Sequence, residues 1–274
     1  MLTSYQLSAL GRQQADRVIH LPVRSYIGAP SDRMPGLTAD VLELPLRQTA
    51  FIELHCWNVG FPDGPAYPNE YFVDMGSPAC TTLGEQIVVE RIKPALQAAR
   101  AAGMAVFHVQ PENIARKHPQ ARYLLEPRLS GPAMPPAAIP GYGQARADRV
   151  HGPGYRDWEG WETMDIPRVV YPLSDEGVII TGPQFDRILR ERGIINLIYT
   201  GFATNMCILD SAAAMKEMQR FGYRCILLRD CTLAVEFPDT IDELVNTKVA
   251  IRYIETWVGA TATRDDFLAA VRTA

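Results

Sequence analysis

A cysteine placed just after a glycine break is the first feature of this sequence that could do chemistry. Residues 194–199 form a short apolar run typical of a buried strand, Gly201 interrupts it, and we expect a helix to begin at about Thr204. Thr204 or Asn205 would cap that helix with a side-chain oxygen. Cys207 would then lie in the first turn, where the helix dipole and free backbone amides favour the thiolate. This arrangement predicts an activated nucleophile; the alternative is a small buried hydrophobe, the usual role of a free cysteine.

A carboxylate and an imidazole form a second candidate group. Residues 49–58 are typical of a first core strand, and Glu53 and His55 stand out from its mostly apolar run. Because they lie two residues apart on a strand, their side chains share one face. They form either an acid–base pair at the ligand-binding edge of a parallel sheet or a satisfied polar pair at the end of that sheet. The residues alone favour neither interpretation.

The elements that must position these groups alternate between strand and helix. Helices are predicted from apolar residues at helical spacing, from following glycines and from capping residues, at residues 83–102, 184–192, 204–221, 238–253 and 264–272. Further strands are predicted at residues 104–109, 177–181, 223–228 and 256–260. Such alternation predicts an α/β fold in which helices cover both faces of a parallel sheet through right-handed crossovers.

Two segments interrupt the alternation. Residues 1–48 are rich in glycine and proline and are predicted to form an irregular N-terminal arm, in which only residues 18–23 resemble a strand. Residues 110–168 are too long for an ordinary connection, which is typical of a lid, a binding loop or a subunit arm. We therefore expect one domain over residues 49–274, with residues 110–168 as an insertion.

Composition and charge argue against several function classes. The 274 residues are 47% hydrophobic and 21% charged, which is ordinary for a globular enzyme. The net charge of -4 and the lack of a basic run give no reason to expect nucleic acid as a partner. No window approaches the roughly 18 apolar residues of a membrane helix, and no secretory signal is predicted. The five cysteines are scattered without a CxxC pair, which favours a reducing cytoplasm over a disulfide framework.

Cofactor and metal motifs are missing from the sequence. Residues 141–143, Gly-Tyr-Gly, follow no predicted strand, and Arg146 stands where a dinucleotide fingerprint needs glycine. No phosphate-binding Gly-Lys-Ser/Thr motif is present. His108 has no second histidine or acid at ligand spacing, which favours a buried core or edge histidine over a metal ligand. We expect neither a cofactor nor a metal.

Three segments resemble the isochorismatase-like hydrolases, also called the cysteine hydrolase family. Residues 49–58 are similar to that family's opening strand, Thr-Ala-Leu-Leu-Val-Ile-Asp-Met-Gln-Asn. Residues 201–213 are similar to its Gly-x-x-Thr-x-x-Cys-Val-x-x-Thr-Ala signature, and residues 222–230 to its Gly-Tyr-x-Val-x-Val-Val-x-Asp strand. The resemblance covers roughly residues 49–109 and 178–272.

The resemblance implies a Rossmann-like three-layer αβα fold whose parallel sheet has about six strands. It also implies hydrolysis of a small amide or ureido C–N bond through a thioester. Cys207 falls on the nucleophile of the family's Cys–Lys–Asp triad, and the backbone amides of Ala203 and Cys207 fall on its oxyanion hole, often with a cis peptide just before the position of Thr204. His55 stands at the position of the base aspartate and Thr181 at that of the lysine, so both depart from the family's pattern.

The departures leave three hypotheses. In the first, the chain is a hydrolase of small amide, ureido or ester-like substrates, in which His55 takes the thiol proton of Cys207 and Glu53 orients His55. Lys117, in the long loop, is either a substitute for the triad lysine or a solvated side chain. In the second, the chain is a catalytically silent relative that binds a ligand or serves as an assembly subunit. A vinyl-ether hydrolase ranks last, because that reaction relies on the missing aspartate.

The sequence also suggests which residues contact a substrate and whether the chain assembles into oligomers. The residues predicted to contact a small-molecule substrate are Trp57, Asn58, Phe61, Thr181 and Thr204. Trp158 and Trp161 would extend an aromatic lining, although tryptophans are commonly core residues. A homodimer or homotetramer is expected, because the family usually assembles and the arm and the insertion have no core of their own.

Overall fold

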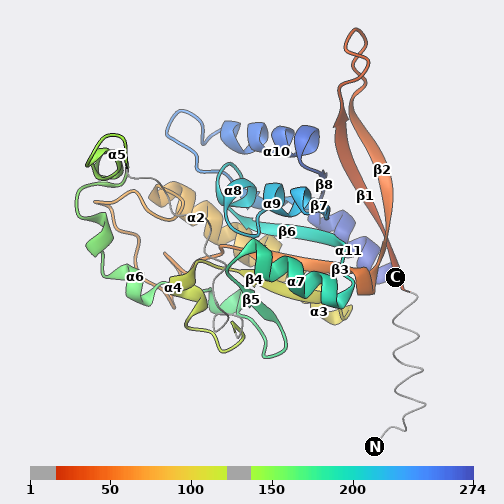
Figure 1. Ribbon diagram of the computed structural model, residues 1–274, viewed down its shortest axis with the longest axis horizontal. Coiled ribbons are helices and arrows are strands. Elements are labelled where there is room, and N and C mark those ends of the chain that lie inside the picture. The colour runs from red at the N-terminus through yellow and green to blue at the C-terminus, as the bar shows by residue number, and fades with distance from the viewer. Residues whose placement is uncertain (1–16, 122–136) are drawn as a thin grey trace, which may run out of the picture.

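The computed structural model describes residues 17–121 and 137–274, and its centre is one eight-stranded sheet (Figure 1). The strands are ordered β2-β1-β8-β7-β6-β3-β4-β5 across the sheet. Their bounds are β1 Val18–Ile27, β2 Gly36–Pro45, β3 Thr49–Leu54, β4 Ala105–Val109, β5 Gly177–Ile179, β6 Asn196–Phe202, β7 Arg224–Leu233 and β8 Ala260–Ala262. The predicted α/β class is thus confirmed.

The six strands from β8 to β5 pair in parallel, and this part of the sheet is the one that the sequence predicts. The other two strands, β1 and β2, form an antiparallel hairpin at one edge. It joins the sheet where Arg24 pairs with Thr261 of β8, and the Arg24 guanidinium forms an ion pair with Glu255. The short strand predicted at residues 18–23 is confirmed as part of β1, but the irregular arm predicted around it is wrong for residues 24–27 and 36–45, because ten consecutive residue pairs from Val18–Pro45 to Ile27–Gly36 form a regular ladder.

Helices cover both faces of the parallel strands, as expected for a three-layer fold (Figure 1). One face carries α2 Pro78–Ile87, the π-helical turn η2 Val88–Ile92, α3 Lys93–Ala101 and α11 Arg264–Thr273. The other carries α7 Gly182–Arg192, α8 Cys207–Asp210, α9 Met215–Arg220 and α10 Val245–Trp257. Within the described ranges, none of the helices is long and apolar enough to cross a membrane.

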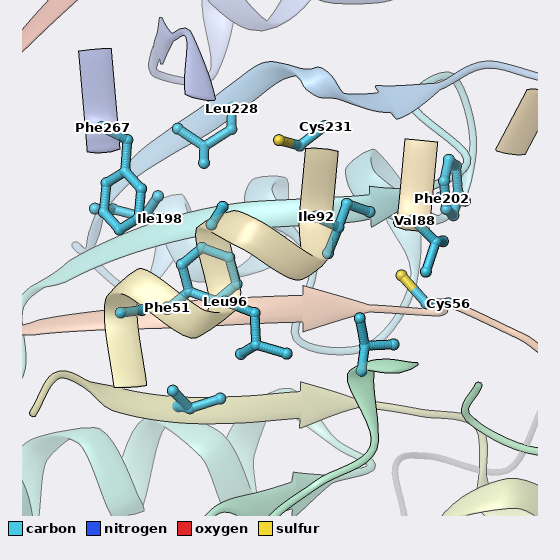
Figure 2. Close-up of a cluster of buried hydrophobic side chains, with 14 of the residues drawn as sticks. Phe51, Cys56, Val88, Ile92, Leu96, Ile198, Phe202, Leu228, Cys231 and Phe267 are labelled. Carbon is cyan, nitrogen blue, oxygen red and sulfur yellow. The ribbon is translucent and has the colours of Figure 1, made fainter. Parts of the chain in front are cut away.

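The two faces of each central strand fill two separate cores. On β3, Phe51 points into the cluster with Ile92, Leu96 and Phe267 (Figure 2), whereas Ile52 belongs to the cluster on the opposite face. This alternation follows from the period of two in a strand. All six residues of β3 are buried, which explains the nearly continuous apolar run in the sequence.

Three predicted boundaries in the C-terminal half are wrong, and one of them is the start of the helix predicted at residues 238–253, which begins only at Val245. The helix predicted for residues 204–221 is split into α8 and α9, because Ser211 and Ala214 adopt extended backbone conformations and Ala213 has a positive φ of 58°. The strand predicted for residues 256–260 begins only at Ala260, since α10 continues through Trp257.

The segment at residues 110–168 contributes short helices on the rim of the carboxyl ends of the strands. Its elements are α4 Glu112–Ala115, α5 Tyr142–His151, the 3-10 turn η4 Tyr155–Asp157 and α6 Gly160–Thr163. Two further 3-10 turns, η1 Leu46–Gln48 and η5 Arg168–Val170, precede β3 and follow the segment. Part of the predicted insertion, residues 122–136, lies outside the described residues.

Candidate active site

A pocket of about 190 Å³ opens beside the carboxyl ends of three parallel strands. His55 follows β3, Ala203 follows β6 and Val235 follows β7, so the loops after these strands form much of its wall. Open parallel sheets bind ligands at this edge. The lining residues are His55, Trp57, Phe72, Val73, Asp74, Met75, His151, Tyr155, Trp161, Phe202, Ala203, Met206, Cys207 and Val235.

Cys207 lies in this pocket as the first residue of α8. The predicted caps are wrong: Met206 precedes the helix without a side-chain cap, while Thr204 bonds Thr232 at 2.7 Å and Asn205 accepts from the Val235 amide. The prediction of a thiolate is also wrong, because burial raises the pKa of the Cys207 thiol by more than the hydrogen bond from the Ala203 backbone amide lowers it. A four-residue helix has too few aligned peptide dipoles to reverse that effect. The sulfur therefore starts as a thiol and needs a base.

His55 shares the pocket with Cys207, as predicted. Its ring stacks on Trp57, with 5.3 Å between ring centroids, and its backbone φ is 51°. Its Nδ1 atom is buried and has no hydrogen-bond partner in the described part of the chain. Burial lowers the pKa of His55 to about 4, so the ring is neutral near pH 7 and one nitrogen is able to accept a proton.

Glu53 lies in the sheet core and bonds His108, so the predicted contact with His55 is replaced by another histidine. The His108 Nδ1–H donates to Glu53 Oε2 at 2.8 Å, and Nε2–H donates to Glu176 Oε2 at 2.9 Å. Burial alone would lower the pKa of His108, but the hydrogen bonds and charges of Glu176 and Glu53 raise it overall. A ring that donates from both nitrogens is an imidazolium. The expectation that His108 is a buried histidine is confirmed.

A second cation completes this buried group. The Arg100 guanidinium donates to both oxygens of Glu176, at 2.6 and 2.8 Å. These contacts, together with His108, hold the pKa of Glu176 at about 2 although burial acts in the opposite direction. We call Glu53, His108, Glu176 and Arg100 the ionic array. Its two carboxylates and two cations balance, as buried charges require.

The ionic array also reaches the wall of the pocket. Glu53 Oε1 accepts from the backbone N–H of Cys56 at 3.0 Å, directly after His55. Gln110 connects Glu53 Oε2, 3.4 Å away, with the Trp57 indole N–H at 3.1 Å. Glu53 thus fixes the backbone that follows β3, and its effect on His55 is indirect.

Asp74 is a pocket carboxylate that the sequence did not indicate. It lies in the loop between β3 and α2, and its Oδ2 accepts from the Thr81 hydroxyl at 3.1 Å. Burial raises the pKa of Asp74 to about 6, although hydrogen bonds from Met75 and Thr81 act in the opposite direction. No motif surrounds Asp74, and only its place in a loop rich in aromatic residues after β3 could have signalled its role.

Ala203 and the aromatic residues Trp57 and Trp161 line the pocket, in agreement with their predicted positions. A cis peptide joins Phe202 to Ala203, one residue earlier than the bond expected before Thr204. The insertion supplies Trp161 together with His151 and Tyr155, whose rings stack with 4.5 Å between centroids. Trp158 packs edge-on against Trp161 and is not a lining residue. The insertion therefore acts as part of the pocket wall.

Three residues predicted to contact substrate have structural roles instead. Asn58 connects loops, since its side chain accepts from the Asp165 amide at 2.7 Å and donates to the Asp63 carbonyl at 2.9 Å. Phe61 is buried in the hydrophobic core beside α2. Thr204 is fully buried against Thr232.

The predicted replacements for the triad lysine lie away from the pocket. Thr181 caps α7 by accepting from the Gln184 amide at 3.4 Å. Lys117 donates to the carbonyl oxygens of Glu162 and Met164, at 2.5 and 2.7 Å, and so fastens the insertion. Neither side chain is among the lining residues, and the structure offers neither as a substitute for the lysine.

The acidic, histidine and cysteine side chains of the described ranges do not form a metal site. Over residues 17–121 and 137–274, no group of three or more His, Cys, Asp or Glu side chains is arranged to hold a metal ion. The acids and histidines of the ionic array are already paired with one another.

Comparison with known proteins shows which of them have sequences similar to this chain. Residues 177–256 match the isochorismatase domain family. The chain is 39% identical over 84 residues to the ureidoacrylate amidohydrolase RutB of Azorhizobium caulinodans, a match that covers 31% of this chain and 33% of that protein. It is 25% identical to the RutB of Rhizobium rhizogenes, over 89% of this chain and 93% of that protein. The match thus spans about a third of the first of these relatives and nearly all of the second.

A solved structure shows the same fold. The cysteine hydrolase from Pseudomonas syringae pv. phaseolicola aligns with 83% of this chain and 94% of its own, with a TM-score of 0.51 and 18% sequence identity. At that identity the likeness concerns the fold alone. It agrees with the three-layer arrangement described above.

Proposed function

We propose that this chain is an isochorismatase-like hydrolase and that it cleaves a small amide or ureido C–N bond, or an ester-like bond, through a thioester on Cys207. His55 acts as the base in place of the family's aspartate. The observation that supports this most directly is that Cys207 and His55 line one small pocket, where the His55 Nδ1 atom has no partner within the described residues. A nucleophile and a base beside one cavity are the minimum that covalent acyl transfer requires.

The first half of the reaction follows from the two shifted pKa values. Because burial raises the pKa of the Cys207 thiol and lowers that of His55, the resting pair is a thiol and a neutral imidazole. The imidazole takes the thiol proton as the sulfur attacks the carbonyl carbon, and the C–S bond forms. The backbone amides of Ala203 and Cys207 would stabilise the negative oxygen. The C–N bond then breaks as the imidazolium returns its proton to the leaving nitrogen.

The pocket limits the substrate to a small molecule. Its volume of about 190 Å³ lies below the range of about 300–1,000 Å³ that is typical of pockets for drug-sized ligands. Aromatic side chains dominate the wall, among them Trp57, Phe72 and Trp161, and these suit a flat or apolar acyl group. The RutB proteins are named as amidohydrolases of ureidoacrylate, which supports an amide or ureido bond as the one cleaved.

The test is a Cys207→Ser variant assayed on a panel of small amides, ureido compounds and esters. We expect turnover to fall by about 10³-fold or more, because the nucleophile is lost, while His55→Gln should lower kcat by about 10²- to 10⁴-fold. Cys225→Ala is the matched control, since that cysteine is buried in the core away from the pocket. Activity of Cys207→Ser equal to that of the control would contradict the proposal.

A second candidate function, ligand binding without turnover, is favoured by the raised pKa of the Cys207 thiol. A thiol of that kind reacts slowly with alkylating reagents. Labelling with iodoacetamide at mildly acidic pH distinguishes the two functions. Selective labelling of Cys207, lost in His55→Gln, supports catalysis; labelling no faster than a free thiol supports a silent binding protein.

A further inference from the structure

Asp74 places a carboxyl group in the pocket that already holds Cys207 and His55. The side chain is fixed through Oδ2, which accepts from the Thr81 hydroxyl at 3.1 Å. Thr81 is buried on α2, a helix that begins at Pro78 and is capped by Ser77. The Met75 backbone N–H also donates to this carboxyl group, and because a carboxylate has about four lone-pair sites, these two hydrogen bonds leave acceptor capacity for a ligand.

The backbone holds Asp74 in an uncommon conformation. Its φ is 49°, in the left-handed region, and it is flanked by Val73 and Met75, which also line the pocket. Aspartate tolerates this region better than most residues do, and Asp74 and His55 are the two pocket residues among the four non-glycine residues of the described chain that have a positive φ. Placing a carboxyl group among apolar side chains has a cost in stability, which is most readily explained by a role in the pocket.

Asp74 is also the better base of the two groups, Asp74 and His55, that line the pocket together with Cys207. Burial raises the pKa of Asp74 to about 6, whereas it lowers the pKa of His55 to about 4. General-base catalysis is most efficient when the pKa of the base lies near the working pH. Near pH 7 the Asp74 carboxyl group is mostly ionised and can accept a proton. Because its pKa is the higher of the two, it then binds that proton more tightly than the His55 imidazole would.

We propose that Asp74 is a further catalytic residue, the general base that activates the water which hydrolyses the thioester on Cys207. This inference rests on the proposed function, because it concerns the second half of the same reaction. The pocket is small enough that an acyl group on Cys207 and a water molecule would fill much of it beside the carboxylate.

The second half of the reaction balances with Asp74 as the only proton carrier. The Asp74 carboxylate takes a proton from the water molecule while the water oxygen attacks the carbonyl carbon of the thioester, and a C–O bond forms. The tetrahedral intermediate then collapses, the C–S bond breaks, and the acid product leaves. The proton moves from the Asp74 carboxyl to the departing sulfur, so that thiol and carboxylate are both restored.

The experiment uses p-nitrophenyl acetate, an ester whose coloured product is released when Cys207 is acylated. In Asp74→Asn we expect a burst of nitrophenolate followed by a steady rate lower by about 100-fold or more, with an acetyl group retained on Cys207 in the mass spectrum. The wild-type protein should show little retained acetyl group. Asp239→Asn, which changes an exposed aspartate outside the pocket, is the matched control. A steady rate in Asp74→Asn equal to that of the control would overturn the inference.

The pH dependence supplies a second readout. The titratable residues around the carboxyl are His55, His151, Tyr155 and Cys207 in the pocket, with Cys56, Tyr67 and Cys80 behind it. Deacylation by the wild-type protein should rise as the pH passes about 6, where Asp74 ionises. Thr81→Val keeps the carboxyl group but removes a hydrogen bond that favours its charged form, so this rise should move to higher pH. An unmoved rise in a folded Thr81→Val protein would contradict the assignment.

The outcomes separate this inference from the proposed function. If Cys207→Ser gives the same steady rate as the wild type and no acetyl group is ever found on Cys207, the proposed function fails. If Cys207 is acetylated but the adduct accumulates in His151→Gln and not in Asp74→Asn, the nucleophile stands and Asp74 is not the base. His151 is the relevant alternative because its ring also lines the pocket, with Nδ1–H donating to the Phe72 carbonyl at 2.7 Å.

Discussion

Replacing His108 by glutamine removes the positive charge between the two buried carboxylates of the ionic array. Glu53 has no solvent-exposed surface and would keep only the Cys56 amide at 3.0 Å and the Gln110 amide at 3.4 Å. Glu176 would still hold Arg100. Removing one partner of a buried ion pair costs about 3–5 kcal/mol, because the other charge is left uncompensated. We expect His108→Gln to lose about that much free energy of unfolding.

Glu53→Gln should cost less, at about 1–3 kcal/mol. Its amide oxygen still accepts from Cys56, and His108 adapts by losing a proton and accepting from the new NH₂ group. The double variant should therefore be more stable than the sum of the two single changes predicts, by about 0.5–3 kcal/mol.

Urea unfolding at pH 7 measures these differences. With an m value of about 3 kcal/mol per M, the midpoint of His108→Gln should fall by about 1 to 1.7 M. His20→Gln, on the exposed side of β1, makes the same chemical change without a buried partner and should stay within about 0.5 kcal/mol of the wild type. A His108→Gln midpoint equal to that of this control would refute the ionic array as a charged unit.

The unfolding free energy that His108→Gln loses depends on pH, and the sign of that dependence follows from the shifted pKa values. His108 has a raised pKa in the folded state, so its contribution is fully present below the unfolded value of 6.5 and is lost as the pH rises through the folded value. Glu176 has a pKa of about 2 against 4.5 unfolded, so its contribution is present above 4.5 and is lost as the pH falls toward 2. The difference between wild type and His108→Gln should be largest between about pH 4.5 and 6.5.

Two further predictions concern the stability of a Gly201 variant and the charge of the preferred substrate. Gly201→Ala should lower the free energy of unfolding by about 3 kcal/mol or more in a urea titration, because φ is 111° there and a Cβ would lie 1.9 Å from the Leu54 carbonyl oxygen. Gly28→Ala, which meets nothing within 4 Å, is its control and should leave the midpoint nearly unchanged. Neutral small amides should give a kcat/KM about 10-fold or more above that of ureido acids with a free carboxylate, because Asp74 is an acid and neither Lys nor Arg occurs among the described residues that line the pocket. The opposite preference in a direct competition assay would show that a cation outside those residues recognises the substrate.

The parallel part of the fold was predictable because its signals are local. Strands such as β6 are buried at every residue, so their apolar runs stand out between glycine breaks and amphipathic helices. The β1–β2 hairpin was missed because glycines and prolines such as Pro30, Pro35 and Pro45 are typical of irregular segments, and because most of β2 is at least partly exposed. Its residues pair by backbone hydrogen bonds, which a side-chain pattern does not report.

At the site, the sequence indicated Cys207 and His55, because each follows a buried strand at a recognisable motif. It could not indicate that burial would govern both pKa values, since that depends on the walls that the insertion and the loop after β3 contribute. Glu53 was assigned to His55 from shared strand direction alone, whereas pairing of β3 with β4 places His108 directly beside it. Asp74 reaches the pocket from a loop without regular structure, so no spacing rule could find it.

The π-helical turn at Val88–Ile92 sets the rotation of Thr81 relative to the part of the helix that packs on the sheet. Such a turn holds one more residue than an α-helical turn of the same helix, so it rotates the preceding stretch by about 100° relative to the following one. Thr81, which holds Asp74, precedes the turn, and Leu96, which packs on the sheet, follows it. Deleting one residue of this turn would rotate the stretch that carries Thr81 while Leu96 stays packed on the sheet, so the hydrogen bond that holds the Asp74 carboxyl group would be lost.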